Sequence, residues 1–320
     1  MSSGAWETRR LRRWLGAMAL GFGLGLGLVA CGGGTSQYEP FQPTRLYAFG
    51  DEASLLLPDG RKYTVNAVNA TTGALDCAGQ PVWVQGLAAI YGFVFAECNP
   101  AAVAAPQGRM RAALGAKVAD LAGQIDVEMS RGGYSATDLA TVMLGVNDVL
   151  ELYAQFPQRS EAALIDDARA RGTQLAQQIN RLVGMGPRVI VATIPDMGFS
   201  PYALAQKALF TDTDRAALIS RLSAALNARM RVEVLNDGRF VGLVLGDEMV
   251  QAMARSPGSF GLLNASTAVC TTTLPGCTSQ TLVTNGNATN WLWADDRRMS
   301  FGGHQRLAIQ AEARARNNPF

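Results

Sequence analysis

Histidine is almost absent from this sequence of 320 residues, in which His304 is the only one. The five cysteines are also few, and none of them stands in a close pair. Zinc sites are built from clustered cysteine and histidine side chains, so this composition argues against one. Nothing in the sequence implies a metal or an organic cofactor.

The sequence also lacks a surplus of basic residues once its N-terminal segment is set apart. Residues 1–30 contain four of the 28 Lys and Arg residues and one of the 26 Asp and Glu residues. The remaining chain therefore has 24 basic and 25 acidic residues, a net charge of −1. Such a chain offers no basic surface to a nucleic acid, and we expect no nucleic-acid partner.

A long apolar run is present only near the N-terminus, where residues 14–30 form a glycine-rich hydrophobic segment. This segment is short for a membrane span, and it follows a cluster of arginines, which is the order of a secretory signal. The arginines are Arg9, Arg10, Arg12 and Arg13.

The hydrophobic segment ends in Leu-Val-Ala followed by Cys31 and three glycines. Small residues before a cysteine resemble a bacterial lipoprotein cleavage site. We expect residues 1–31 to be a signal peptide with its lipidation cysteine, and Cys31 to carry the lipid anchor. Gly32 after the cysteine favours the outer membrane, so the expected location is the cell envelope, facing the periplasm. An ordinary signal peptide, or an anchoring helix with an incidental cysteine, is the alternative.

The remaining chain is predicted to consist of a tether and one domain. Residues 32–43 are polar and rich in Gly and Pro, which is typical of a flexible tether. Residues 44–320 have the length for one large α/β domain or two small ones. The sequence does not determine an oligomeric state.

An even number of cysteines remains in this expected exported domain, which favours two disulfides. The pair Cys270 and Cys277 would close a local loop, and the pair Cys77 and Cys98 would close a second one. Other pairings, or free buried thiols, remain as alternatives.

Apolar runs alternate with amphipathic helical patterns along the domain. Strands are predicted at residues 45–50, 138–144, 187–194 and 240–245, and helices at 116–129, 160–183, 212–234 and 304–313. Residues 51–105 are predicted to be loops with short strands. The alternation predicts a three-layer α/β/α fold with a central parallel sheet. In such sheets, sites form at the carboxyl ends of the strands.

Four segments, in order along the chain, resemble the conserved blocks of the SGNH hydrolases, also called GDSL esterases and lipases. They are AFGDEAS, ALGAKVADLAGQI, LGVND and WLWADDRRMSFGGH, and the segment IPDMGFSPYA resembles a further strand end of bacterial members. The resemblance implies an SGNH-hydrolase or flavodoxin-like fold and hydrolysis of carboxylic esters. It also implies a structural turn at Gly50 and Asp51, oxyanion donors at Gly115 and Asn147, and a catalytic carboxylate at Asp295.

The sequence departs from the family at both reacting positions. Glu52 stands where the family has its nucleophilic serine, and Arg298 stands where it has its histidine base. A guanidinium stays protonated at neutral pH and cannot act as a general base. Because serine and histidine touch in the family, we expect Glu52 and Arg298 to form an ion pair, with Asp295 as a second partner of Arg298. If both side chains pointed to solvent, no pair would form.

Two alternatives keep a catalytic site. In the first, Ser54 and His304 act with Asp295 or Asp296 as a shifted triad, although by their register both are supporting residues. In the second, Glu52 works with Asp51 or Asp295 as a carboxylate pair of the kind used in glycoside hydrolysis.

The sequence thus predicts an envelope lipoprotein of SGNH-hydrolase type that is catalytically degenerate. Its expected role is to bind an acyl-ester or glycan ligand in the old cleft, or to support an envelope assembly. An active carboxylic-ester hydrolase with the shifted triad is the alternative, so catalytic activity stays open at this point.

Overall fold

The computed structural model describes residues 40–320. The predicted signal peptide, Cys31 and most of the predicted tether lie outside the described residues. Within residues 40–320, no helix combines the length and the apolar character that crossing a bilayer requires.

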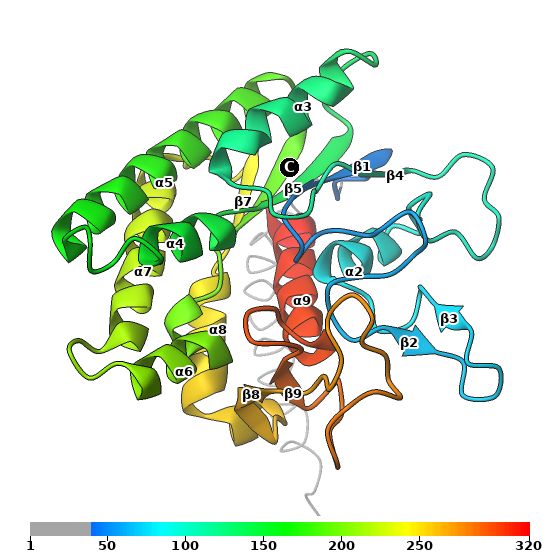
Figure 1. Cartoon of the computed structure of the whole chain (residues 1–320). Coiled ribbons are helices and arrows are strands. Elements are labelled where there is room, and N and C mark those ends of the chain that lie inside the picture. The colour runs from blue at the N-terminus through cyan, green and yellow to red at the C-terminus, as the bar shows by residue number, and fades with distance from the viewer. Residues whose placement is uncertain (1–39) are drawn as a thin grey trace, which may run out of the picture. The chain divides into compact units, whose positions relative to one another are not determined.

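Five parallel strands form the central sheet (Figure 1). Along the sheet they lie in the order β4-β1-β5-β6-β7. Numbered along the chain, this is the order 2-1-3-4-5 of flavodoxin-like folds, which confirms the predicted fold class. The strands are β1 (Arg45–Gly50), β4 (Gly108–Met110), β5 (Asp138–Met143), β6 (Arg188–Ala192) and β7 (Val241–Val244).

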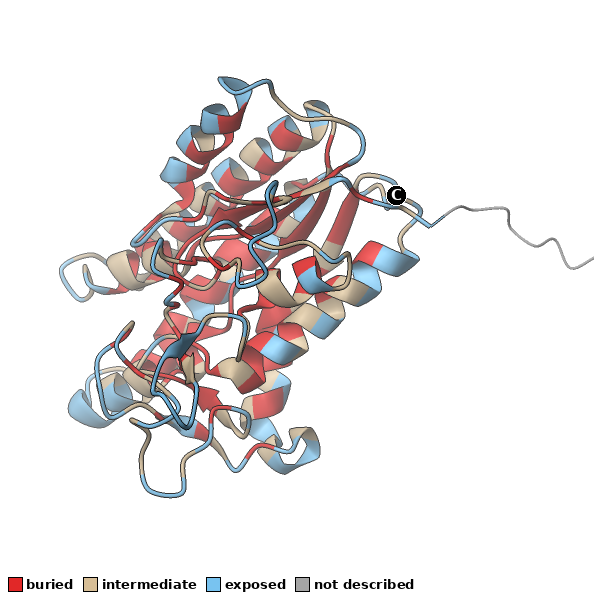
Figure 2. Cartoon of the chain, turned by 90° about the vertical axis from the view of Figure 1, so that its right-hand side faces the viewer, coloured by how far each residue is buried: buried red, intermediate tan, exposed pale blue. Residues whose placement is uncertain are grey.

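Helices cover both faces of the sheet, and the residues coloured as buried gather in the sheet and on the inner sides of the helices (Figure 2). One group packs together on one face: α3 (Leu121–Met129), α4 (Val146–Tyr153), α5 (Glu161–Gly184) and α7 (Arg215–Glu233). The other face is covered by α2 (Trp83–Ala89), α8 (Gly246–Arg255) and α9 (Phe301–Asn317). Helix α6 (Pro201–Leu209) packs beside α7.

The long helices begin at polar caps that the sequence contains. Ser160 caps α5 by accepting from the amide of Ala163, and Asp214 caps α7 by accepting from the amide of Ala217. Apolar side chains then recur on the face toward the sheet, such as Leu175 and Ile179 in α5. The predicted bounds of both helices are therefore close to the observed ones.

The prediction for residues 51–105 was wrong in one respect, because this region contains helix α2. The region also holds the small antiparallel pair β2 (Ala67–Val68) and β3 (Leu75–Asp76). A second small pair, β8 (Asn264–Ala268) and β9 (Trp291–Trp293), lies before α9. Short 3₁₀ turns complete the chain at Val118–Asp120, Met197–Phe199 and Pro257–Phe260.

Both expected disulfides are present. Cys77 and Cys98 are joined, and so are Cys270 and Cys277. Each bridge lies in a segment with little regular structure, where a covalent link replaces the hydrogen bonds of a helix or sheet.

Candidate active site

The turn after β1 places Glu52 at the carboxyl end of the sheet. Gly50 has a φ of 140°, and a Cβ there would lie 2.3 Å from the carbonyl oxygen of Met143 on β5. Only glycine allows this close approach. The side chain of Gln124 donates to and accepts from the backbone of Gly50, at 2.9 Å in each bond. Asp51 then accepts a hydrogen bond from the amide of Ala53 at 3.0 Å.

Glu52 meets Arg298 across the strand ends, as the sequence predicted. Arg298 Nη2 lies 2.9 Å from Glu52 Oε1, and Arg298 Nη1 lies 2.8 Å from Asp295 Oδ2. Asp295 Oδ1 also accepts the backbone amide of Arg298 at 2.6 Å. The guanidinium carbon lies 5.3 Å from the centre of the Tyr63 ring. Arg298 therefore bridges two carboxylates and covers an aromatic ring.

Asn147 turns its amide toward the same carboxylate. Its Nδ2 donates to Glu52 Oε2 at 2.9 Å and to the carbonyl of Ala116 at 3.1 Å. In the resemblance, this amide is the donor that faces an oxyanion. Here it is occupied by a side chain of the protein itself. Gly115 lies in an exposed loop with a φ of 69°.

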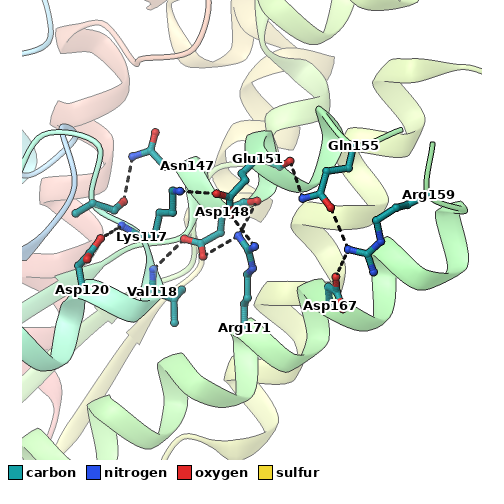
Figure 3. A network of polar contacts seen from close by, with 11 residues as sticks. Lys117, Val118, Asp120, Asn147, Asp148, Glu151, Gln155, Arg159, Asp167 and Arg171 are labelled. Atoms are coloured by element: carbon teal, nitrogen blue, oxygen red, sulfur yellow. Dashed lines mark hydrogen bonds and ion pairs between the residues drawn. The ribbon is translucent and has the colours of Figure 1, made fainter. Parts of the chain in front are cut away.

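A polar network fixes the start of α4 against the loop that carries Gly115 (Figure 3). Asp148 Oδ2 accepts the amide of Val118 at 2.9 Å, and Asp148 Oδ1 pairs with Arg171 of α5 at 3.1 Å. Arg171 also contacts Glu151 at 2.7 Å. Asp148 is thus a structural residue, and it holds the neighbouring Asn147 in place.

The ion pair keeps Glu52 and Arg298 charged, whereas burial favours the neutral form of Asp51. Burial alone would raise the pKa of Glu52, but hydrogen bonds from Asn147 and Arg298 outweigh it and leave the pKa below its usual value. The carboxylates of Asp295 and Glu52 outweigh burial at Arg298 and raise its pKa. Burial, together with the charge of Glu52, raises the pKa of Asp51 to about 8. Glu52 is therefore ionised at neutral pH, and Asp51 is largely protonated.

The space that remains above Glu52 is small. A pocket of about 30 Å³ lies there, enough for roughly two ordered waters. Its walls combine the polar groups of the ion pair with apolar side chains. The apolar walls are Ala53, Val146, Leu150, Pro195 and Met299.

The shifted triad of Ser54, His304 and Asp295 is not formed, so this alternative was wrong. Ser54 is fully buried, and its Oγ accepts a hydrogen bond from Trp83 of α2 at 3.0 Å. Neither ring nitrogen of His304 has a hydrogen-bond partner. Burial and the charge of Lys62 lower the pKa of His304 to about 3. A base needs a partner within hydrogen-bond reach, and His304 has none.

Asp296 does not complete a triad either. Its Oδ1 pairs with Arg297 at 3.2 Å, and its backbone carbonyl accepts the amide of Tyr202 at 2.9 Å. The carboxylate pair of Glu52 with Asp295 is likewise engaged, because both carboxylates bind Arg298. Asp51, the other partner considered for Glu52, has one buried carboxyl oxygen without a hydrogen-bond partner.

Two aromatic residues of the site were missed from the sequence. Tyr63 lies under Arg298, and Trp83 binds Ser54. Neither belongs to a motif, so only the fold reveals their roles. Within residues 40–320, no three or more His, Cys, Asp or Glu side chains gather in a group suited to a metal ion.

Neither protein-family models nor curated protein sequences match this chain. Solved structures do, and one is a member of the lipolytic G-D-S-L family from Veillonella parvula, with 12% identity and a TM-score of 0.39 over 83% of this chain and 95% of that one. An acetylxylan esterase from Geobacillus stearothermophilus has 13% identity and a TM-score of 0.41 over 87% and 97%. An α/β hydrolase from the metagenome of Lake Arreo has 16% identity and a TM-score of 0.41 over 85% and 94%.

Similarity at this level carries no argument about activity. The fold rests on the strand order of the chain itself and on the position of its motifs at the strand ends. The chain has a three-layer α/β/α fold with flavodoxin-like strand order, and an ion pair occupies the two positions at which the sequence resemblance implies a serine and a histidine.

Proposed function

We propose that this chain is a non-hydrolytic envelope lipoprotein that binds an acylated ligand, such as an acylated glycan, at the mouth of the former ester-hydrolysing cleft. One observation carries the proposal. Arg298 bridges Glu52 and Asp295 at 2.9 and 2.8 Å, at the positions where a nucleophile, a base and its orienting carboxylate would act.

The ion pair removes each part of the serine mechanism. Glu52 offers a carboxylate that Arg298 and Asn147 hold ionised and hydrogen-bonded, and Arg298 cannot accept a proton. The amide of Asn147 stabilises this carboxylate and is not available for an oxyanion. The protein thus places its own carboxylate against the amide to which the resemblance assigns the oxyanion.

The shape of the pocket limits the ligand. A free volume of about 30 Å³ does not admit a long acyl chain, whereas its apolar walls suit a short group such as acetyl. The remainder of such a ligand would rest on the surface around the mouth. This supports a short-chain acylated glycan over a lipid as the ligand.

Ester hydrolysis tests the lost chemistry directly. We expect the full-length chain, purified in detergent, to hydrolyse p-nitrophenyl acetate no faster than buffer. The double variant Glu52→Ser/Arg298→His restores a serine and a histidine beside Asp295, and it should gain measurable turnover. The control Glu52→Ser/Arg297→His places its histidine on the neighbouring residue and should stay inactive. Turnover by the unmodified chain would refute the loss of catalysis. If the Ser54→Ala variant kept that turnover, the shifted triad would not be its source.

Ligand binding needs its own test. A partly O-acetylated oligosaccharide should broaden in its proton spectrum when the protein is added, and the same oligosaccharide after alkaline deacetylation should not. Val146→Phe places a larger side chain in the pocket wall and should abolish the effect. Equal broadening by both oligosaccharides would contradict recognition of the acyl group.

The lipid anchor is tested separately. Cys31 lies outside the described residues, and its role rests on the sequence before it. Expression of the Cys31→Ser variant should move the protein from the membrane fraction to the soluble fraction. Retention in the membrane fraction would favour an uncleaved anchoring helix.

A further inference from the structure

A second pocket lies at the edge of the sheet and shares no lining residue with the cleft. Its volume is about 430 Å³, within the range of small-molecule sites. We call it the arginine pocket, because four arginines line it together with two glutamates. These residues are Arg45, Arg109, Arg111, Arg131, Glu97 and Glu128.

Strand geometry explains why the arginines gather. Arg45 and Tyr47 are two residues apart on β1, and Tyr47 is paired with Arg109 on the edge strand β4. Alternate residues of a strand point to the same face, so Arg45 and Arg109 share one face. Arg111 follows two residues after Arg109. Arg131 adds a fourth guanidinium just beyond the end of α3, which packs against β1 (Figure 1).

Two of the arginines are neutralised by the protein. Arg45 makes a bidentate contact with Asp138 at 2.8 and 2.9 Å. Arg111 binds Glu128 at 2.6 Å. These pairs form the fixed wall of the pocket.

The other charges of the pocket have no partner of opposite sign among residues 40–320. Arg109 donates only to the backbone carbonyls of Pro106 and Gly108, and the side chain of Arg131 makes no hydrogen bond or ion pair with a described residue. Glu97 makes no ion pair, and its Oε2 is buried without a hydrogen-bond partner. The Cys77–Cys98 disulfide fixes the segment that carries Glu97. Two unpaired cations and one unpaired anion leave the pocket with a net charge of +1.

We propose that the arginine pocket binds a sugar that carries one carboxylate. The carboxylate of such a ligand would bind Arg109 and Arg131 and balance the excess charge of the pocket. A hydroxyl of the ligand would donate to the carboxylate of Glu97, which accepts no hydrogen bond within residues 40–320. A simple anion offers no such hydroxyl, and a neutral sugar offers no charge.

Calorimetric titration of the full-length chain in detergent with three probes tests this inference. D-glucuronate has the carboxylate and the hydroxyls, sulfate has only the charge, and D-glucose has only the hydroxyls. We expect glucuronate to bind about tenfold more tightly than either other probe, the effect of roughly one charge-assisted contact. Sulfate binding as tightly as glucuronate, or no heat with glucuronate, would overturn the proposal.

Single variants test separately the binding of the carboxylate by the arginines and the binding of the hydroxyl by Glu97. Arg109→Gln and Arg131→Gln should each weaken glucuronate binding about fivefold or more. Glu97→Gln should weaken glucuronate and leave sulfate unchanged or tighter. The control Arg169→Gln removes an exposed arginine of α5 that pairs with Asp166, and it should change nothing. Because Glu52→Gln alters only the cleft, it should not affect glucuronate, and the inference therefore stands or falls independently of the proposed function.

Discussion

The cleft and the arginine pocket both concentrate charge, but they treat it in opposite ways. In the cleft, Glu52 accepts from Arg298 and Asn147, and Arg298 contacts Asp295 as well. In the arginine pocket, Glu97 and Arg131 have no partner of opposite charge among residues 40–320.

This difference separates a closed site from an open one. A buried charge is costly unless it is paired and hydrogen-bonded. In the cleft, the carboxylate of Glu52 is paired with Arg298 and hydrogen-bonded by Asn147, so it needs no partner from a ligand. The arginine pocket leaves Arg109, Arg131 and Glu97 without ion-pair partners among residues 40–320, and a ligand of complementary charge would pair with them. The pairing of the charges thus indicates that a charged ligand would bind in the arginine pocket, whereas a ligand of the cleft would be held by its apolar walls.

The largest effect on stability is expected when Arg298, the cation at the centre of the cleft, is removed. Arg298→Ala leaves Glu52 buried without its positive partner, and we expect a loss of about 4 kcal/mol in the free energy of unfolding. Urea unfolding measures this loss. Arg297→Ala removes a neighbouring arginine that is 42% exposed, and it should cost less than about 0.5 kcal/mol. Similar losses in both variants would contradict the special role of Arg298.

Acid pH should lower the free energy of unfolding through His304, a buried side chain that the fold keeps uncharged. Folding holds its imidazole neutral with a pKa of about 3, whereas the unfolded chain has the ordinary value of about 6.5. Between these values the unfolded chain binds a proton that the folded chain does not, so stability falls as the pH falls.

The expected loss from His304 is about 3 kcal/mol between pH 6.5 and pH 4. Urea unfolding of the chain and of His304→Leu at both pH values isolates this contribution. The variant should lose less stability on acidification than the unmodified chain. Parallel pH profiles would mean that His304 is not held neutral by burial.

Replacing one glutamate in each pocket compares the stability that a paired and an unpaired carboxylate contribute. Glu52→Gln removes a charge that Arg298 stabilises, and we expect it to cost about 2 kcal/mol. Glu97→Gln removes a charge without a partner, so it should be neutral or stabilising by up to about 1 kcal/mol. Thermal unfolding of the two variants, side by side, measures the difference. Equal destabilisation would show that Glu97 has a partner in the folded chain.

The smallest effect is expected for Arg131→Gln. Its side chain is exposed and makes no hydrogen bond or ion pair with a described residue, so the free energy of unfolding should change by less than about 0.5 kcal/mol. Thermal unfolding in the presence of glucuronate should nevertheless distinguish it, because the ligand would stabilise the unmodified chain more than the variant. A large loss without ligand would assign Arg131 a structural role instead.

The ion pair could be predicted because motif positions carry spatial information. Glu52 and Arg298 lie far apart in the sequence, but the resemblance places their positions in contact, and the opposite charges followed from the residues. The parallel sheet between two helical layers could be predicted because buried runs such as that of β6 alternate with long amphipathic helices.

The surroundings of the cleft could not be predicted in this way. Helix α2 has only seven residues, includes Gly86, and is too short to give a helical period. The partner of Ser54, Trp83, lies on this helix. Close to His304 the backbones approach tightly, because a Cβ at Gly302 would lie 2.2 Å from the carbonyl of Thr289. The sequence alone does not reveal such a contact.

The sequence contains a signal of the arginine pocket that the sequence analysis did not use. Arg109 and Arg111 alternate in GRMR, which is typical of one face of a strand. However, β4 has only three residues, and its pairing with β1 sets which other side chains face the same way. Only this register brings Arg45 beside them.

The contact between Glu52 and Arg298 joins residues that are 246 positions apart. Contacts of such separation form slowly, because the entropy of closing the loop must be overcome before the contact forms. During synthesis, Glu52 emerges long before the arginine that neutralises it, and its carboxylate stays hydrated until the last helix docks. We therefore expect the cleft to close late in folding, and a chain that ends before β9 would lack Arg298 and leave Glu52 without its ion-pair partner.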